Sequence, residues 1–503
     1  MDYLDGIAVG FATALTWTNL LYVLVGVLAG MFIGVMPGLG PTATVALLLP
    51  FTLNVDAAGA IIMLAGVYYG SMYGGTITSV MLKVPGEAST VVTVLDGYPM
   101  ASQGRAASAL GIAAIGSLFG GIVAVIGIAL LAPQMAQFAL SMGSAALTGV
   151  ALLGLVLVAY VGTKSTVKSL AMASVGLLLA TVGLDPFTGG PRLNFGILEL
   201  TSGIDIVVLT VGLLGVSELL RLLSRRDTQI DKLAPLAKVG KTVLPTRDDF
   251  KQSKWAIGRG SILGFFLGLV PGGGGVLSSL ASYAVERRLA KDPSRFGKGA
   301  IEGVAGPETA NNAASQSAFV PLLTLGLPSN SVLAVIYGAL LLQGVTPGPS
   351  LITNHPDVFW GVLASMLVGN VILVVLNIYF IRVWVKLLRI PTHYLVPVAM
   401  AVIVVSIFAI NNSMFDVALV FLFGLIGWVL NKFGLEPSPL VLGFVLGKIL
   451  EVNIRRALVV GDGGIGVFLE DPVSAVALSI IAVLLIARVT ASLRARSARK
   501  TTV

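Results

Sequence analysis

Two glycine-rich breaks hold the residues whose types and spacing are suited to chemistry. The stretch GVMPGLGPTA runs from Gly34 to Ala43, inside sequence that is otherwise as apolar as a membrane helix, and a second copy reads PGGGG at Pro271–Gly275. A glycine-rich turn leaves successive backbone N–H groups free and lets a ligand approach closely. A helix that starts after the turn points its positive N-terminal end at it. We therefore expect the two breaks to bind an anion.

Groups beside the breaks extend this prediction. The hydroxyls that would add hydrogen bonds to the anion are those of Thr42, Thr44, Ser278 and Ser279. The apolar helices that end at Val35–Met36 and Leu269–Val270 offer terminal carbonyls, which suit Na⁺. The alternative interpretation is a pair of packing kinks, and a single break would favour it.

The break belongs to an internal repeat. The first copy has Gly26, Gly30, Gly34, Pro37, Gly38 and Gly40, and the second has Gly260, Gly264, Gly268, Pro271, Gly272 and Gly274, at the same spacing. A looser match follows around Pro85 and Pro328. Discontinuous apolar segments at corresponding positions of two halves indicate the binding site of a secondary transporter.

Composition places the whole chain in a membrane. Of the 503 residues 56% are hydrophobic and 11% charged, with a mean hydropathy of +0.95, whereas soluble domains carry about 25% charged residues. The absence of cysteine excludes disulfides, thiolate metal sites and iron–sulfur clusters. His355 and His393 lie near prolines outside the apolar runs and are interpreted as loop residues. We expect no cleaved signal peptide, because the N-terminus lacks a basic n-region and an A-x-A cleavage site.

Apolar runs of spanning length follow one another along the chain. We predict an all-α polytopic membrane protein with about twelve transmembrane segments, an inverted structural repeat and two re-entrant or broken helical hairpins. The clear runs lie near residues 106–132, 135–161, 167–183, 203–220, 358–380, 394–410, 414–430 and 472–489, and interrupted runs lie at 19–36, 57–82, 256–270, 300–327 and 331–345.

Charge divides the chain and orients it. We predict a first membrane half at 1–220 with its broken helix at Pro37–Pro41, a basic cytoplasmic linker at 221–259, and a second half at 260–503 with its broken helix at Pro271–Gly275. The linker and the basic C-terminal tail belong in the cytoplasm by the positive-inside rule. Because no lysine or arginine precedes Lys83, the first break is expected to face the periplasm, whereas the second has basic flanks and is expected to face the cytoplasm. The net charge of +8 thus reflects topology beside the lipid bilayer and gives no hint of nucleic-acid binding.

Two polar stretches lie between the apolar runs. GPETANNAASQS, from Gly306 to Ser317, is dense in amides and hydroxyls, and its counterpart GVYYGSMYGGTITS offers tyrosines and hydroxyls. Polar side chains at membrane depth tend to face an interior cavity, and such groups can bind a carboxylate; interhelical hydrogen bonding is the alternative. Lys83 and Glu87 flank Pro85 and either pair with each other or contact a ligand.

Rival functions find less support. A G-x-G-D aspartyl protease motif fails because Val459 stands where its first glycine belongs, and no phosphate-binding loop for ATP occurs. We therefore expect no catalytic residues. A passive organic-anion channel stays open as the alternative, although an inverted repeat within one chain favours a carrier.

These motifs resemble the large membrane subunit of the tripartite tricarboxylate transporters of bacteria. The resemblance rests on GVMPGLGPTATVALLLP, YYGSMYGGTITSVMLKVPGE, LDGYPMASQGRAASALG, PGGGGVLSSLASYAVE and GPETANNAASQSAFVPLLTLGLPSNS. It implies ion-driven symport of a carboxylate such as citrate across the cell inner membrane. It also implies a small membrane subunit and a periplasmic solute-binding protein as partners. The binding features of the family carry over to Pro37–Thr42, Pro85–Glu87, Pro271–Gly275, Asn311–Gln316 and Pro328–Asn330.

From the motifs and the resemblance together we select candidate residues. The substrate-binding candidates are Gly38, Leu39, Gly40, Pro41, Thr42, Gly272, Gly273, Gly274, Gly275, Asn311, Asn312, Ser315, Gln316, Ser329 and Asn330. The ion-coupling candidates are Thr76, Ser79, Pro85 and Gly86. We expect no cofactor and no resident metal. Na⁺ is preferred over H⁺ as the coupling ion, because no buried carboxylate stands out in the sequence as a proton carrier.

Overall fold

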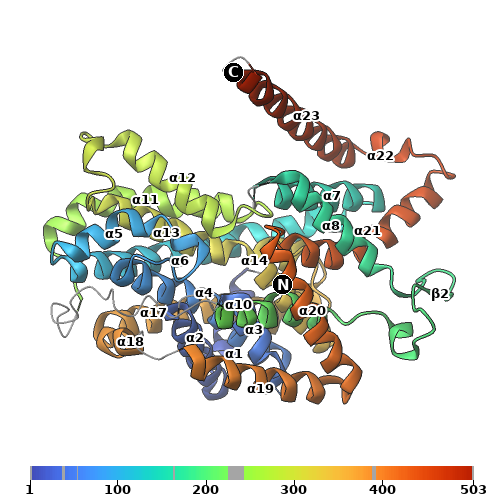
Figure 1. Cartoon of the computed structure of the whole chain (residues 1–503), viewed down its shortest axis with the longest axis horizontal. Coiled ribbons are helices and arrows are strands. Elements are labelled where there is room, and N and C mark those ends of the chain that lie inside the picture. The colour runs from blue at the N-terminus through green and yellow to red at the C-terminus, as the bar shows by residue number, and fades with distance from the viewer. Residues whose placement is uncertain are drawn as a thin grey trace. The chain divides into compact units, whose positions relative to one another are not determined.

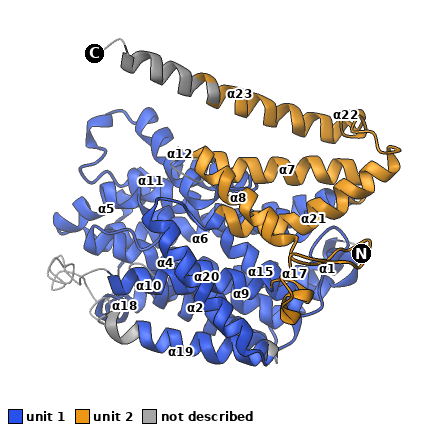
Figure 2. Cartoon of the chain, turned by 45° about the vertical axis from the view of Figure 1, so that its right-hand side comes forward, with its two compact units in different colours: residues 1–139, 205–438 blue, residues 140–204, 439–503 orange. Residues whose placement is uncertain are grey.

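The chain is helical in nearly all of its regular structure. The computed structural model describes residues 3–36, 40–53, 55–161, 165–224, 243–387 and 392–500. The strands within these ranges are the two-residue β1 (Gly183–Leu184) and β2 (Pro191–Arg192), which pair antiparallel. The prediction of an all-α protein is therefore confirmed. The helices form two compact units, residues 1–139 with 205–438 and residues 140–204 with 439–503 (Figure 2).

Unit 1 contains both glycine-rich breaks. Its elements up to residue 140 are α1 (Tyr3–Ala14), α2 (Trp17–Val35), α3 (Pro41–Leu48), η1 (Leu49–Thr52), α4 (Ala57–Leu82), η2 (Ala88–Thr90), α5 (Thr93–Ser102) and α6 (Ala106–Leu140). Its later elements are α9 (Ile206–Thr210), the π-helix η4 (Val211–Val216), α10 (Ser217–Ser224), α11 (Arg247–Gly268), α12 (Gly274–Leu289), η7 (Pro293–Arg295), α13 (Glu302–Ser317), α14 (Phe319–Leu325), α15 (Ser331–Leu342), α16 (Leu351–Asn354), α17 (Pro356–Tyr379), α18 (Ile381–Leu387), α19 (Thr392–Asn411) and α20 (Met414–Lys432).

Several helices have the length and hydropathy of membrane spans. Within the described residues these are Trp17–Val35, Ala57–Leu82, Ala106–Leu140, Ile206–Ser224, Pro356–Tyr379 and Met414–Lys432. Other apolar helices, such as Ser331–Leu342, are shorter. This pattern is that of a multi-pass membrane protein.

The repeated glycines of the first half are the contact between α2 and α4. A Cβ built on Gly26, Gly30 or Gly34 would lie 2.3–2.4 Å from a carbonyl oxygen of α4, so only hydrogen fits there. The carbonyls belong to Met63, Val67 and Ser71, on successive turns. Small residues at every fourth position let the two backbones touch along their length.

The second half repeats this contact with α11 and α13. A Cβ on Gly260, Gly264 or Gly268 would lie 2.2–2.5 Å from the carbonyl oxygens of Gly306, Ala310 and Ala314. These carbonyls follow those of α4 at one constant sequence offset, and α11, α12 and α13 lie side by side (Figure 1). The sequence repeat is therefore also a repeat in packing.

The match continues beyond the helices. Lys83 ends α4 in the left-handed conformation with φ 59°, and Gly326 ends α14 in the same conformation with φ 70°. The offset that relates Met63 to Gly306 relates these two residues as well, and each is followed two residues later by a proline, Pro85 or Pro328. The left-handed residue closes the helix and turns the chain.

Some expected boundaries shift. The polar stretch from Gly306 to Ser317 belongs to the continuous, largely buried helix α13, which includes Pro307. Helix α6 runs through Pro133, where two separate runs were predicted, and α11 begins at Arg247, so the end of the predicted linker is helical. The second arm of the later hairpin is the whole of α12. The predicted division into halves at the linker stays a prediction.

Unit 2 is a smaller helical unit. Its elements are α7 (Ser144–Val161), α8 (Thr166–Ala180), β1, β2, η3 (Leu198–Ser202), α21 (Ser438–Val460), α22 (Val467–Glu470) and α23 (Pro472–Lys500). Helix α21 was not predicted, because Lys448, Glu451 and Arg455 interrupt its apolar sequence. It packs closely on α8, since a Cβ on Gly176 would lie 2.0 Å from the Leu440 carbonyl oxygen.

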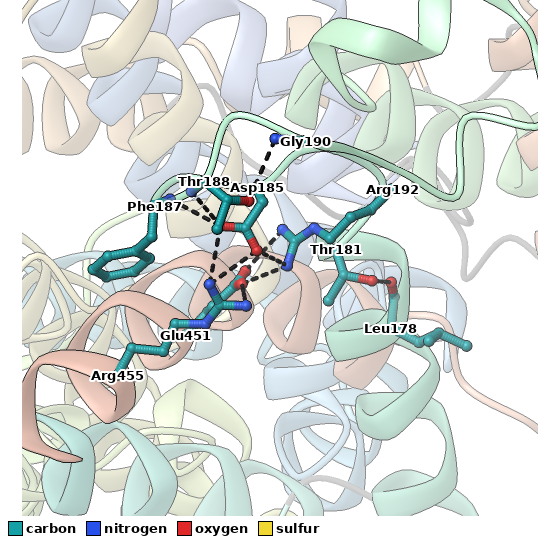
Figure 3. A network of polar contacts seen from close by, with 9 residues as sticks. All are labelled: Leu178, Thr181, Asp185, Phe187, Thr188, Gly190, Arg192, Glu451 and Arg455. Atoms are coloured by element: carbon teal, nitrogen blue, oxygen red, sulfur yellow. Dashed lines mark hydrogen bonds and ion pairs between the residues drawn. The ribbon is translucent and has the colours of Figure 1, made fainter. Parts of the chain in front are cut away.

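A charged network ties the β1–β2 loop of unit 2 to α21 (Figure 3). Asp185 accepts from the amides of Phe187 and Thr188 at 2.9 and 3.0 Å and from Arg455 Nη1 at 2.9 Å. Arg192 in β2 binds both carboxylate oxygens of Glu451, at 2.6 and 3.2 Å. The hydrogen bond from Arg455, with those of the two amides, holds the pKa of Asp185 well below its usual range. The loop is therefore fixed by charge as well as by its turn.

Candidate functional site

The second break has a definite backbone structure at the start of α12. Gly272 has φ +78°, and its N–H donates to the Ser329 carbonyl at 2.9 Å. The N–H of Gly273 donates to the Val270 carbonyl at 3.0 Å. The prediction that the break leaves successive amides free is therefore wrong for these two residues. Helix geometry leaves the amides of the first turn of α12, which opens at Gly274, without acceptors in their own helix.

Asn311 faces that helix start with an unpartnered amide. A Cβ on Gly275 would lie 2.3 Å from Asn311 Oδ1 and 2.9 Å from Ser89 Cβ. Asn311 is fully buried, and neither Oδ1 nor Nδ2 has a hydrogen-bond partner among the described residues. Burying an unpaired amide costs about 1–3 kcal/mol. An amide kept there at that cost, beside a helix N-terminus, is suited to binding a ligand.

A buried carboxylate lies one turn before Asn311 in α13. Glu308 is 1% exposed and accepts hydrogen bonds from Thr76 Oγ1 at 2.6 Å and from Thr93 Oγ1. The hydroxyl of Tyr73, buried and without a partner in the described chain, lies near enough to interact electrostatically with Glu308. The expectation that no buried carboxylate stands out is therefore wrong. It failed because Glu308 sits in a polar stretch that the sequence did not identify as a buried helix.

The first hairpin makes the reciprocal contact. Helix α12 packs on η2 of the first half, and α3 packs on α15 of the second half. Thr42, in the first turn of α3, shares a 3.2 Å hydrogen bond with Ser331, the first residue of α15. Asn330, the N-cap of α15, donates to the Tyr68 hydroxyl at 3.0 Å. The offset that relates Met63 of α4 to Gly306 of α13 also relates Tyr68 to Asn311. Each half therefore supplies one polar side chain at an equivalent position.

Part of the first break lies outside the described residues. Pro37, Gly38 and Leu39 belong to that part, so the roles predicted for Gly38 and Leu39 stay predictions. Gly40 caps α3 in an extended conformation, and Pro41 occupies the first turn, where its missing N–H has no acceptor to lose.

The other predicted residues of α13 join helices to one another. Asn312 Nδ2 donates to Ser117 Oγ of α6 at 2.7 Å, and Gln316 forms a two-way amide pair with Asn370 of α17 at 3.0 and 3.2 Å. Ser315 donates to the carbonyl of Asn312. For Gln316 the geometry favours interhelical hydrogen bonding over ligand contact.

The ion-coupling candidates divide between two settings. Thr76 bonds Glu308 as described, whereas the Ser79 hydroxyl lies 2.8 Å from Thr90 Oγ1 and 2.9 Å from the Gly75 carbonyl, and its single hydrogen is donated to one of them. Gly86 after Pro85 is wedged against Gly34, whose carbonyl oxygen would lie 2.5 Å from a Cβ there. Ser329, at the position equivalent to Gly86, bonds the Ala318 carbonyl and accepts from Gly272. Ser79, Gly86 and Ser329 thus hold the chain in place around the proline turns at Pro85 and Pro328.

Two of the helix-end carbonyls proposed for Na⁺, those of Val35 and Val270, have hydrogen-bond partners. Thr78 Oγ1 donates to the Val35 carbonyl at 3.0 Å, and the Val270 carbonyl accepts from Gly273. No ion pair joins Lys83 to Glu87 in the described part of the chain; the Lys83 ammonium lies 5.6 Å from the centre of the Tyr98 ring. The interpretation that Lys83 and Glu87 pair with each other is therefore wrong.

Sequence reasoning missed three contact residues. They lie just after the proline turns at Pro85 and Pro328, in segments with no glycine or proline signature of their own: Ser89, Thr93 and Ser331. The repeat offset was the signal that would have found them, because it aligns the residues after Pro85 with those after Pro328.

Hydroxyls, amides and one carboxylate thus converge between two broken hairpins inside an apolar helical unit. Such a set binds ions and polar solutes without covalent chemistry. The fold and site define a polytopic α-helical membrane transporter.

The chain belongs to the tripartite tricarboxylate transporter TctA family, whose model matches residues 20–442. This is a family of transporters and not of enzymes, and its tripartite organisation implies further subunits. The chain is 46% identical over 480 residues to an uncharacterized 52.8 kDa protein in the TAR-I ttuC′ 3′ region of Agrobacterium vitis, with 95% of each chain covered. It is 50% identical over 233 residues to an uncharacterized protein in the TAR-II ttuC′ 3′ region of that organism, which covers 46% of this chain and 96% of the relative. No solved structure matches the chain.

Proposed function

We propose that this chain is the carrier of a cation-coupled system that takes up a di- or tricarboxylate, such as citrate, across the bacterial inner membrane. The observation that carries the proposal is the polar contact at the start of α12. There Asn311 holds a buried amide that has no partner among the described residues. The helices that follow the two breaks, α3 and α12, each pack against the other half of the repeat. A helix N-terminus with an adjacent amide suits a carboxylate group.

The reciprocal packing supports alternating access. Two equivalent hairpins that meet around one polar region can open it first to one side and then to the other. The basic flanks of the second break support a cytoplasmic position for that break, for the linker and for the C-terminus, and a periplasmic position for the first break.

The partners we propose are a small membrane subunit and a periplasmic solute-binding protein that delivers the carboxylate. Family membership supports both. For the coupling ion we propose Na⁺ on a ground other than the absence of a buried carboxylate: the oxygen ligands gathered around Glu308 are of the kind that hard cations bind.

Exchange in proteoliposomes tests the proposal. The chain is reconstituted with its partner subunits, and the vesicles are loaded with unlabelled citrate before labelled citrate is added outside. A carrier concentrates label inside by counterflow, whereas a passive anion channel only equilibrates it. A binding screen of di- and tricarboxylates against the cognate periplasmic protein selects the substrate if citrate is not exchanged. Failure of every carboxylate in both assays would refute the function.

A further inference from the structure

We propose that Glu308, with the hydroxyls of Thr76 and Thr93, forms the site that binds the transported Na⁺. This deepens the proposed function, on which it rests for the direction of transport. The site lies between α4, α5 and α13, and therefore joins residues of both halves of unit 1.

Comparison with the other buried carboxylates sets Glu308 apart. Among the described residues the buried carboxylates are Asp96, Asp185, Asp249, Glu286 and Glu308. Four of them have a built-in compensation: Asp185, Asp249 and Glu286 pair with arginines, and Asp96 accepts three backbone amides and the Tyr283 hydroxyl. Within the described residues, Glu308 has only the two threonine hydroxyls as partners. Its negative charge therefore lacks a resident counter-charge in the described chain.

Glu286 is the most informative contrast. It is 3% exposed and packs against Gly306, two residues before Glu308 on the same helix, yet both of its carboxylate oxygens bind Arg259, at 2.8 and 2.5 Å. A buried charge without a partner is expensive and is retained chiefly where it has a function. The protein thus neutralises one carboxylate beside α13 and leaves the next for an external cation.

The threonines are oriented to assist such a cation. The two hydroxyls approach different oxygens of Glu308; the Thr76 hydroxyl also lies 3.2 Å from the Met72 carbonyl, but its contact with Glu308 is shorter, at 2.6 Å. Donation to the carboxylate leaves the hydroxyl lone pairs available to a metal ion. Asn312 Oδ1, one turn further along α13, is a buried oxygen without a partner in the described chain, because its Nδ2 takes the contacts to Ser117 and the Glu308 carbonyl. Carboxylate, hydroxyl and amide oxygens are the ligands of hard cations. One carboxylate charge matches a monovalent ion.

The position of the site explains how Na⁺ and substrate would be linked. Glu308 and Asn311 lie three residues apart in α13, and Thr93 follows the segment that contains Ser89, the neighbour of Gly275. Binding of Na⁺ would draw α4, α5 and α13 together beside the proposed carboxylate position. Na⁺ would also offset the negative charge of Glu308, which otherwise repels an anionic substrate.

Thermal unfolding of the full-length purified chain tests the site directly, with NaCl as the probe and KCl at equal ionic strength as the reference. We expect NaCl to raise the Tm of the wild type in a saturable manner, because Na⁺ binds only the folded chain. Glu308→Gln should abolish this shift. Glu302→Gln is the matched control on the same helix, because Glu302 pairs with Arg295 outside the site, and it should keep the shift.

A second variant keeps the test decisive if Glu308→Gln does not fold. Thr93→Val preserves the carboxylate and the side-chain shape, and should raise the Na⁺ concentration at half-maximal shift by at least about tenfold, the effect of a lost ligand or supporting residue of a metal site. A wild type without a Na⁺-specific shift, or a Thr93→Val variant with the wild-type midpoint, would overturn the proposal. These outcomes are separable from failure of the proposed function, since the Tm assay needs no carboxylate and no partner.

Discussion

Asn311 of α13 and Gly275 of α12 are in such close contact that a Cβ on the glycine would lie 2.3 Å from the asparagine side-chain oxygen. The same Cβ would lie 2.9 Å from Ser89 Cβ in η2. Three segments from two sequence halves therefore meet at one helix start, and they do so through a fully buried amide that lacks a partner in the described chain. Both residues can be varied independently.

Gly275→Ala should lower carboxylate uptake by at least tenfold, about 1.4 kcal/mol or more in transport free energy, because the new methyl group displaces Asn311 or Ser89. Gly258→Ala in α11 is the control, since a Cβ there meets nothing within 4 Å. Uptake and membrane insertion are measured together. Full uptake by Gly275→Ala would show that this contact is not part of the transport site.

Asn311→Ala should separate function from stability. No hydrogen bond within the described chain is lost, and the relief of an unpaired buried amide opposes the cost of the cavity left behind, so we expect no fall in the free energy of unfolding beyond about 1 kcal/mol while uptake falls strongly. Asn370→Ala is the contrast, because it leaves the Gln316 amide buried without its partner and should cost about 1–3 kcal/mol. Denaturation and uptake assays on both variants check this; equal loss of stability in the two would contradict it.

Gly264→Ala and Gly30→Ala should destabilise the chain similarly, by about 1–3 kcal/mol, because each Cβ would lie 2.2–2.4 Å from a backbone oxygen of the partner helix. Gly258→Ala should instead stabilise its helix by up to about 1 kcal/mol. Fluorescence-detected size exclusion after heating gives the order of stability. A Gly264→Ala variant as stable as Gly258→Ala would exclude the close helix contact.

Gly272→Val should abolish uptake while the protein still inserts, because a branched residue is strained at φ +78° and the amide contact with Ser329 fixes that conformation. From the repeat we expect the same of Gly38→Val. Transport and insertion are compared for both. Normal transport by the two variants would refute a role for the breaks.

The β1–β2 loop of unit 2 should loosen in acid. The pKa of Asp185 is lowered in the folded chain, so its contacts stabilise the loop above the pKa of an unfolded aspartate, about 3.9, and this stability is lost as the pH falls further through the folded pKa. The protection factors of the loop amides, which are corrected for the intrinsic pH dependence of exchange, should therefore change little from pH 7 to about 5. Asp185→Asn should speed exchange several-fold at pH 7, and exposed Asp462→Asn should not. An unchanged loop in Asp185→Asn would contradict the argument.

The repeat was the part of this molecule that sequence reasoning reached best. Glycines at every fourth position of an apolar helix allow close approach of a second helix. Each of the repeated glycines in α2 and α11 lies against a backbone carbonyl of the partner helix: Gly26, Gly30, Gly34, Gly260, Gly264 and Gly268. The left-handed helix ends were not foreseen at Lys83, because its side chain gives no hint of that conformation.

The ligand groups were harder to select. Asn311, Asn312 and Gln316 look alike in sequence, but their directions around α13 decide which bonds α6, which bonds α17 and which is left unpaired. The sequence gives the direction of each side chain around the helix, but it does not show which helix packs on that side. Gly272 similarly looked free because its acceptor, the Ser329 carbonyl, is distant in sequence.

The touching backbones of α2 with α4 and of α11 with α13 limit how this protein can change shape. Helices in contact at three consecutive turns cannot slide past each other without steric clash. Each pair is therefore expected to move as one rigid body. Displacement must then be absorbed at the left-handed joints, Lys83 and Gly326, and at the breaks themselves. A locked carrier could accordingly be made by stiffening just those joints, with every ligand-contacting side chain left in place.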